Sequence, residues 1–165
     1  MESRPKIQLQ LTTADRFVES LGWASLISLW AFILLNYSSL PETIATHFNI
    51  SGQPDKYGSK GSILILPIIA TVMFIGLTVL NRYPQIFNFP TALTAENAGR
   101  QYVNATRLIR YLKSVLVLVF GFIAYATMQT TDSHIQGIGV WFFPIMLVLI
   151  FALLGVFVFR AVKMK

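Results

Sequence analysis

Four long apolar blocks, each free of charged residues, alternate with polar segments along the chain. They are Leu21–Tyr37, Ser62–Leu80, Ser114–Gln129 and Ile138–Phe159. Each approaches the roughly 20 residues that a helix needs to cross about 30 Å of hydrocarbon. The blocks are continuously apolar, whereas the strands of a membrane barrel alternate apolar and polar residues. The pattern therefore predicts an all-α fold, a four-helix transmembrane bundle.

The composition indicates that lipid is the solvent of these blocks. Of the 165 residues, 55% are hydrophobic and only 12% are charged, whereas a soluble domain carries about 25% charged residues. The length suits one domain, so residues 1–165 are interpreted as a single integral membrane domain. The chain has no cysteine, which excludes disulfides, thiolate metal ligands and cysteine nucleophiles.

The distribution of basic residues predicts the orientation. Of the 13 Lys and Arg residues, only Lys56 and Lys60 lie between the first and second blocks, and the third connection has none. All others lie on the side of the two termini, and basic residues are retained in the cytoplasm. Both termini are therefore predicted to be cytoplasmic, in a multi-pass protein of the inner (cytoplasmic) membrane. A nucleic-acid partner is not expected, because the basic residues are spread between apolar blocks and not gathered on one face.

Helix starts are predicted at two polar segments on the cytoplasmic side. Thr12 with Asp15 resembles a capping box ahead of the first span. In the inner loop, residues 81–113, Thr94 precedes a segment with apolar residues at helical spacing, which predicts an amphipathic interfacial helix leading into the third span. Its basic residues either bind anionic lipid headgroups, each contributing about 1 kcal/mol, or only fix the topology. They are Arg100, Arg107, Arg110 and Lys113.

The outer loop, residues 40–60, is turn-rich, and a tight reversal is predicted at Gly52 and Pro54. His47 and Asp55 flank the reversal and can approach each other across it. The favoured interpretation is a hydrogen bond that holds the loop in shape. The alternative is a metal or acid–base site, formed with the other acidic and histidine residues expected on that side, which are Glu42, Asp132 and His134.

Motifs in both loops carry a family resemblance. The outer loop follows a pattern through Leu40, Pro41, His47, Phe48, Gly52, Pro54, Asp55 and Lys60, and the inner loop has a Pro-rich aromatic stretch followed by Thr94, Glu96 and Asn97. These motifs resemble the membrane domain-of-unknown-function 1648 family, which also forms the N-terminal part of SdpI-type immunity proteins. Such proteins protect bacteria from a secreted killing peptide, so the resemblance implies this fold unit and a bacterial membrane, with immunity or signalling as one version of the function.

The favoured function is non-catalytic, with the outer loop binding a peptide, lipid or protein partner. The predicted contact residues are His47, Phe48, Asn49, Asp55, Lys56 and Lys60. No cofactor, metal or catalytic residue is assigned. One alternative is a membrane-embedded metal-dependent hydrolase using His47 with Asp55. Another is a small transporter or channel component, which would require oligomerisation because no ionisable residue lies in the middle of a span.

A stripe of small residues in the first span, Ala24, Ser28 and Ala31, predicts close approach of another helix. Packing inside the bundle is the favoured interpretation, and a contact in a homo-oligomer is the alternative.

Overall fold

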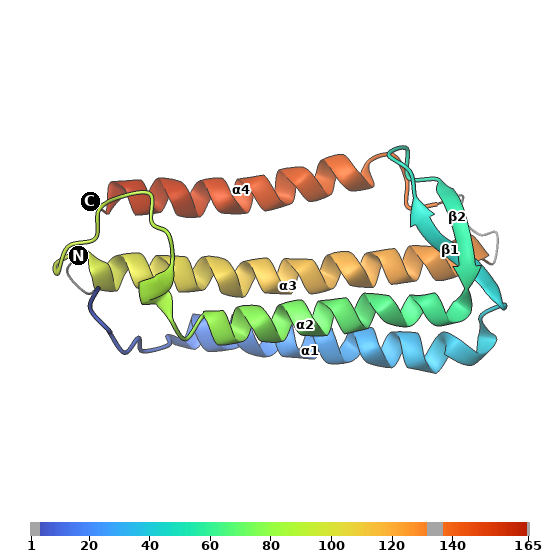
Figure 1. Ribbon diagram of the computed structural model, residues 1–165, viewed down its shortest axis with the longest axis horizontal. Coiled ribbons are helices and arrows are strands. Elements are labelled where there is room, and N and C mark those ends of the chain that lie inside the picture. The colour runs from blue at the N-terminus through green and yellow to red at the C-terminus, as the bar shows by residue number, and fades with distance from the viewer. Residues whose placement is uncertain (1–3, 132–136, 165) are drawn as a thin grey trace.

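The computed structural model describes residues 4–131 and 137–164. Figure 1 shows a long, narrow bundle with both ends of the chain at one end and a β-hairpin at the other. The α-helices are α1 (Thr13–Asn36), α2 (Ile65–Leu80), α3 (Ala98–Thr131) and α4 (Phe142–Lys163), the strands are β1 (Thr43–Phe48) and β2 (Pro54–Ser59), and three short 3-10 helices are η1 (Tyr37–Ser39), η2 (Lys60–Leu64) and η3 (Pro84–Ile86).

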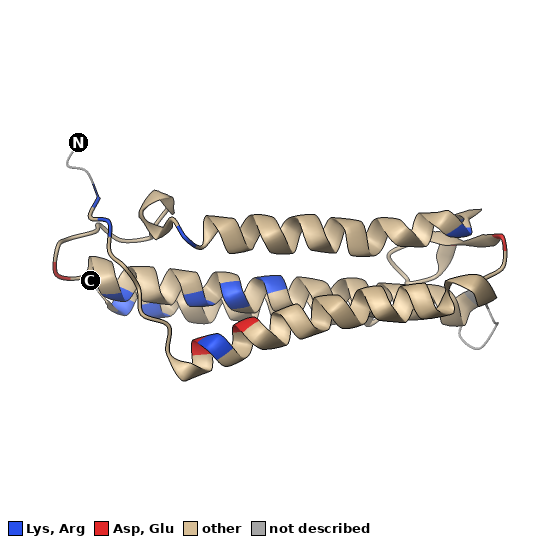
Figure 2. Cartoon of the chain, turned by 90° about the horizontal axis from the view of Figure 1, so that it is seen from below, with Lys and Arg blue, Asp and Glu red and all other residues tan. Residues whose placement is uncertain are grey.

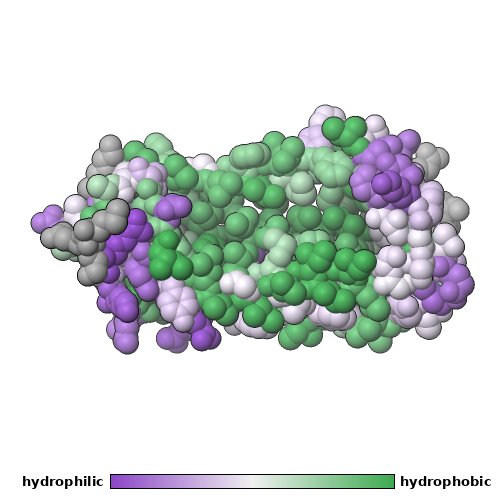
Figure 3. All heavy atoms as spheres, in the orientation of Figure 1, coloured by the Kyte–Doolittle hydropathy of each residue, from purple (hydrophilic) through white to green (hydrophobic). Residues whose placement is uncertain are grey.

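Within the described residues, four helices are long and apolar enough to cross a membrane, as the hydrophobic pattern predicts. Figure 3 shows an apolar band across the middle of the visible face, with hydrophilic residues at both ends. The protein is therefore a multi-pass membrane protein. Figure 2 shows that Lys and Arg gather at the end that holds the termini. We call this the basic end, and the opposite end the hairpin end.

Both predicted helix starts are confirmed. Thr12 is the N-cap of α1 and forms a capping box with Asp15. Before α3, the amide of Asn97 donates to the Thr94 hydroxyl, and the amide of Thr94 donates to the Asn97 side-chain oxygen. These side chains occupy backbone groups that a helix start otherwise leaves unpaired.

The helix predicted in the inner loop and the third span are one continuous helix. At about 1.5 Å per residue, the 34 residues of α3 extend well beyond about 30 Å of hydrocarbon. The first turns of α3 therefore belong to the basic end of the bundle, where they pack against the start of α1 and the end of α2.

Three helices supply most of the main core. Leu26 and Ile33 of α1 pack with Phe74 of α2 and Val117 of α3, all buried. In the middle of the span, the Trp30 indole donates to the Thr71 hydroxyl at 2.9 Å. The helix α4 packs against α3 and is the least buried of the four spans, so most of its apolar surface faces lipid.

Candidate functional site

The loop between α1 and α2 is an antiparallel hairpin. The tight reversal agrees with the turn residues, whereas the two strands were not predicted in a fold interpreted as all-α. Ile44 lies opposite Gly58, His47 opposite Lys56, and Phe48 opposite Pro54, with register shifts on both sides of His47. Asp55 is thereby left between two paired residues of β2 without a partner of its own. A bulge of this kind redirects the extra side chain.

His47 and Asp55 meet across the hairpin, which confirms the predicted approach. The distance from His47 Nδ1 to Asp55 Oδ1 is 2.5 Å. Their side chains are 57% and 39% exposed, so water screens the contact and its contribution to stability is small. The pair therefore joins the two strands at the surface.

Buried apolar side chains anchor the hairpin to the bundle. Ile44 belongs to the main core, whereas Ala45 and Phe48 form a second cluster with Ala126 of α3 and Ile138. Phe48 is only 8% exposed. The sequence placed Phe48 among the contact residues of the loop, but burial makes it an anchor of the hairpin and removes it from the exposed face.

Backbone contacts hold the tip of the hairpin. The Asn49 side-chain oxygen accepts hydrogen bonds from the amides of Ser51 and Gln53, so Asn49 shapes the turn. The Ile138 amide donates to the Gly52 carbonyl at 2.8 Å. Gly52 has a φ of +76°, and a Cβ there would lie 2.4 Å from the carbonyl oxygen of Gly139. Only glycine allows this approach, which ties the tip to the segment before α4.

The exposed face of the hairpin carries both charged and apolar groups. Lys56 and Tyr57 of β2 are exposed, and Ile50 in the turn is 85% exposed. Lys60, at the base, donates to Glu42 at 2.8 Å and lies over the ring of Tyr37. Of the predicted contact residues, His47, Asp55 and Lys56 therefore share an open surface, whereas Lys60 is already engaged.

The predicted outer metal cluster is only partly described. Asp132 and His134 lie outside the described residues. Within residues 4–131 and 137–164, no group of three or more His, Cys, Asp or Glu residues is placed to hold a metal ion.

A second polar site, which the sequence did not predict, lies inside the basic end. Asp15 of α1 accepts from Nε and Nη2 of Arg107 on α3, at 2.7 and 3.1 Å. One turn further along α1, Glu19 accepts from Lys113 Nζ at 2.5 Å, and Arg110 lies at 3.7 Å. Lys113 Nζ also donates to Thr78 of α2. This ion cluster therefore joins α1, α2 and α3.

The ion cluster changes the interpretation of the basic face of α3. The Lys113 side chain is fully buried and that of Arg110 is 9% exposed, so neither presents its charge at the surface as the predicted headgroup contact requires. Arg107 is partly exposed, and Arg100 is exposed. The sequence did carry a signal for this ion cluster. Two acidic residues lie one turn apart in the first helix, and basic residues recur at one-turn intervals in the third; they are Asp15 and Glu19, and Arg107, Arg110 and Lys113.

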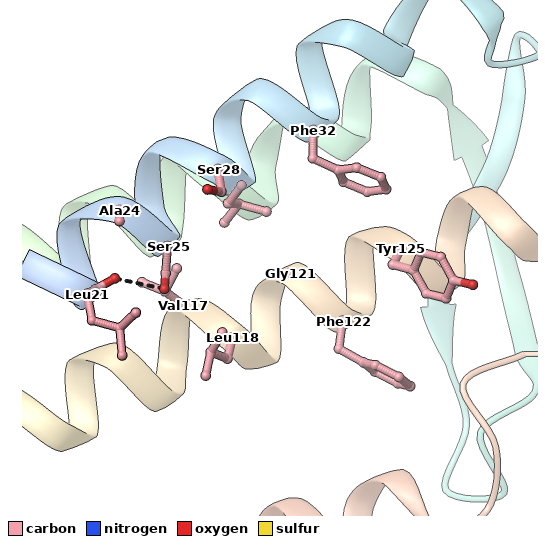
Figure 4. A pocket seen from close by; sticks show the side chains of 11 residues that line it. Leu21, Ala24, Ser25, Ser28, Phe32, Val117, Leu118, Gly121, Phe122 and Tyr125 are labelled. Atoms are coloured by element: carbon pink, nitrogen blue, oxygen red, sulfur yellow. Dashed lines mark hydrogen bonds between the residues drawn. The ribbon is translucent and has the colours of Figure 1, made fainter. Parts of the chain in front are cut away.

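An open groove runs along one side of the contact between α1 and α3, within the apolar band. Its lining includes Ala24 and Ser28 of α1 and Gly121 of α3, with Phe32 and Tyr125 toward the hairpin end (Figure 4). The volume is about 490 Å³. Ala24, Ser28 and Ala31 are all exposed, so the favoured interpretation of this small-residue stripe, packing inside the bundle, is wrong. The contact in a homo-oligomer stays a prediction.

Comparisons with known proteins agree with the family resemblance. Residues 24–71 match the family model described as "Domain of unknown function (DUF1648)", a segment that includes the whole hairpin. An uncharacterized protein of Archaeoglobus fulgidus is 35% identical over 116 residues, or 66% of this chain and 63% of the relative. The matched region thus spans less than two thirds of that relative. No solved structure matches. The resemblance to this family of unknown function is confirmed over residues 24–71, whereas the link to SdpI-type immunity proteins stays a prediction.

Proposed function

We propose that this chain, whose residues 24–71 match a domain family of unknown function, is a non-catalytic membrane protein that binds a peptide or protein partner through its hairpin. The proposed orientation has both termini in the cytoplasm and the hairpin on the outer face of the cytoplasmic membrane. This orientation follows from the scarcity of basic residues at the hairpin end. Immunity or signalling towards a secreted peptide is one version of this function.

The supporting observation is a hairpin that is fixed at its base and tip but open on its face. Ile44 and Phe48 are buried in the bundle, and the Gly52 carbonyl binds the amide of Ile138. Tyr57 and Ile50 are 62% and 85% exposed beside the charged groups of the hairpin. A rigid surface loses little conformational entropy on binding, and tyrosine is enriched among residues that dominate binding energy.

Site-specific photocrosslinking in cells tests this function. A benzoylphenylalanine in place of Tyr57 is expected to give one discrete crosslinked product, because this side chain projects from the hairpin. Tyr83, which is 50% exposed at the basic end, gives the matched control position, where no such product is expected. Asp55→Ala should lower the yield of the product severalfold without lowering the amount of protein in the membrane.

Two results would contradict the binding proposal. Equal crosslinking at positions 57 and 83 would mean that the hairpin has no special affinity for a partner. A fall in membrane abundance that matches the fall in crosslinking would mean that Asp55 acts on the fold alone.

The hydrolase alternative has one observation in its favour, the hydrogen bond between His47 and Asp55. A His–carboxylate pair can serve as an acid–base element. This alternative predicts about one equivalent of metal in the purified protein, lost in His47→Ala, because an imidazole ligand would be removed. Purified protein with no bound metal, measured by elemental analysis, would contradict its metal-dependent form.

A further inference from the structure

A pocket of about 330 Å³ lies between α3 and α4 at the basic end. Its charged lining consists of Arg100 and Arg107 of α3 and Arg160 of α4. Val103 and Met164 supply apolar wall. Three arginines therefore line one recess beside an apolar surface, at the opposite end of the molecule from the hairpin.

The walls of this pocket are fixed by bonds between the two helices. The Gln101 side-chain amide donates to the carbonyl of Ala161, and that of Asn104 donates to the carbonyl of Phe157, both at 2.8 Å. Both amide donors and both carbonyls are in buried residues. The spacing between α3 and α4 is therefore set before any ligand arrives, which lowers the entropic cost of binding.

The pocket has an excess of positive charge. Arg107 forms two hydrogen bonds with Asp15, but within the described parts of the chain no carboxylate lies within ion-pair distance of Arg100 or Arg160. The Arg160 guanidinium lies 5.7 Å from the ring centroid of Phe157. Arginine edges bind phosphate oxygens in pairs of hydrogen bonds.

We propose that this pocket binds the phosphate headgroup of an anionic phospholipid from the leaflet at the basic end. Arg100 and Arg160 hold the phosphate, Arg107 lines the pocket while it stays paired with Asp15, and the apolar wall meets the start of the acyl chains. Basic pockets between transmembrane helices commonly bind the headgroups of anionic lipids. The inference goes beyond the proposed function, because it concerns another surface and another ligand.

Lipid titrations of the purified protein in detergent, followed by native mass spectrometry, test the proposal. We expect phosphatidylglycerol to bind more tightly than phosphatidylcholine. Arg160→Gln and Arg100→Gln should each weaken phosphatidylglycerol binding about fivefold, the equivalent of about 1 kcal/mol per basic residue. Lys163→Gln is the matched control, since it removes the same charge from the last turn of α4 outside the pocket, and it should leave binding within about twofold.

Three outcomes would overturn the proposal. Equal weakening by Lys163→Gln and Arg160→Gln would show a diffuse charge effect. Equal binding of the two lipids would show that the headgroup charge is not recognised. Displacement of phosphatidylglycerol by an equal concentration of inorganic phosphate would identify a free-phosphate site. Circular dichroism of each variant monitors folding, and Arg100→Gln, at an exposed position, keeps the test valid if Arg160→Gln fails to fold.

Discussion

At the scale of single residues, the ion cluster places charged side chains in the interior of the basic end. Lys113 is fully buried, and its ammonium contacts Glu19, Thr78 and the face of the Phe74 ring. Close approach of the helices makes this possible, because a Cβ on Gly22 would lie 2.8 Å from Ser114 Oγ. A buried ammonium is tolerated only while these partners remain.

Glu19→Gln is therefore expected to destabilise the fold by about 3–5 kcal/mol, because it leaves Lys113 buried without a counter-charge. Unfolding of the purified protein in detergent measures the change. Adding Lys113→Met, which removes the buried charge but keeps a long side chain, should recover most of the lost stability. The matched control is Glu42→Gln, in an ion pair with Lys60 where the Glu42 side chain is 85% exposed, for which a change of about 1 kcal/mol or less is expected. Similar losses in the two single variants would contradict the structural role of the ion cluster.

The same residues show why part of the site could not be predicted from the sequence. The spans follow from hydropathy alone, because hydrocarbon excludes charge over a fixed thickness. Contact of Lys113 with Glu19 depends on how α1 and α3 are rotated about their axes, which hydropathy does not specify. Phe48 alternates with polar neighbours in the hairpin, and only the position of α3 beneath it decides that this side is buried. The approach of His47 and Asp55 was predictable because a short turn determines it locally.

At the scale of elements, the hairpin and the segment before α4 are fitted to each other through glycine backbone. Gly52, Gly137 and Gly139 all have positive φ, and a Cβ on Gly137 would lie 2.1 Å from the Gly52 carbonyl oxygen. This contact links the hairpin to the segment before α4 at the hairpin end. At the basic end, the side-chain hydrogen bonds of Gln101 and Asn104 link α3 to α4.

Gly52→Ala is expected to detach the tip of the hairpin, because alanine adds both backbone strain of about 1–3 kcal/mol and a clash with Gly139. Hydrogen–deuterium exchange of residues 43–59 should become faster, while α1 and α2 keep their protection. Gly61→Ala is the control, since its Cβ would meet only ordinary contacts of 3.7 and 3.8 Å. Unchanged exchange in Gly52→Ala would mean that the buried side chains of Ile44 and Phe48 hold the hairpin without the close contact between Gly52 and Gly139.

At the scale of the whole molecule, the two polar ends are chemically different. The hairpin end presents a balanced mixture of Lys56, Lys60, Glu42 and Asp55, whereas the basic end holds the remaining Lys and Arg residues of the described chain (Figure 2). Such asymmetry favours retention of the basic end in the cytoplasm. Both proposals depend on this orientation, because a secreted partner meets only the outer face and an anionic headgroup is abundant in the cytoplasmic leaflet.

Cysteine labelling in intact cells measures the orientation directly, since the chain has no native cysteine. A membrane-impermeant maleimide is expected to label Ile50→Cys, in the hairpin turn, and to label Glu96→Cys only after the membrane is permeabilised. Both positions are exposed, so a difference in labelling reports the side of the membrane and not burial. The opposite result would place the three arginines of the α3–α4 pocket outside and the hairpin in the cytoplasm. The hairpin could then bind only an intracellular partner, and a secreted peptide would be excluded as its ligand.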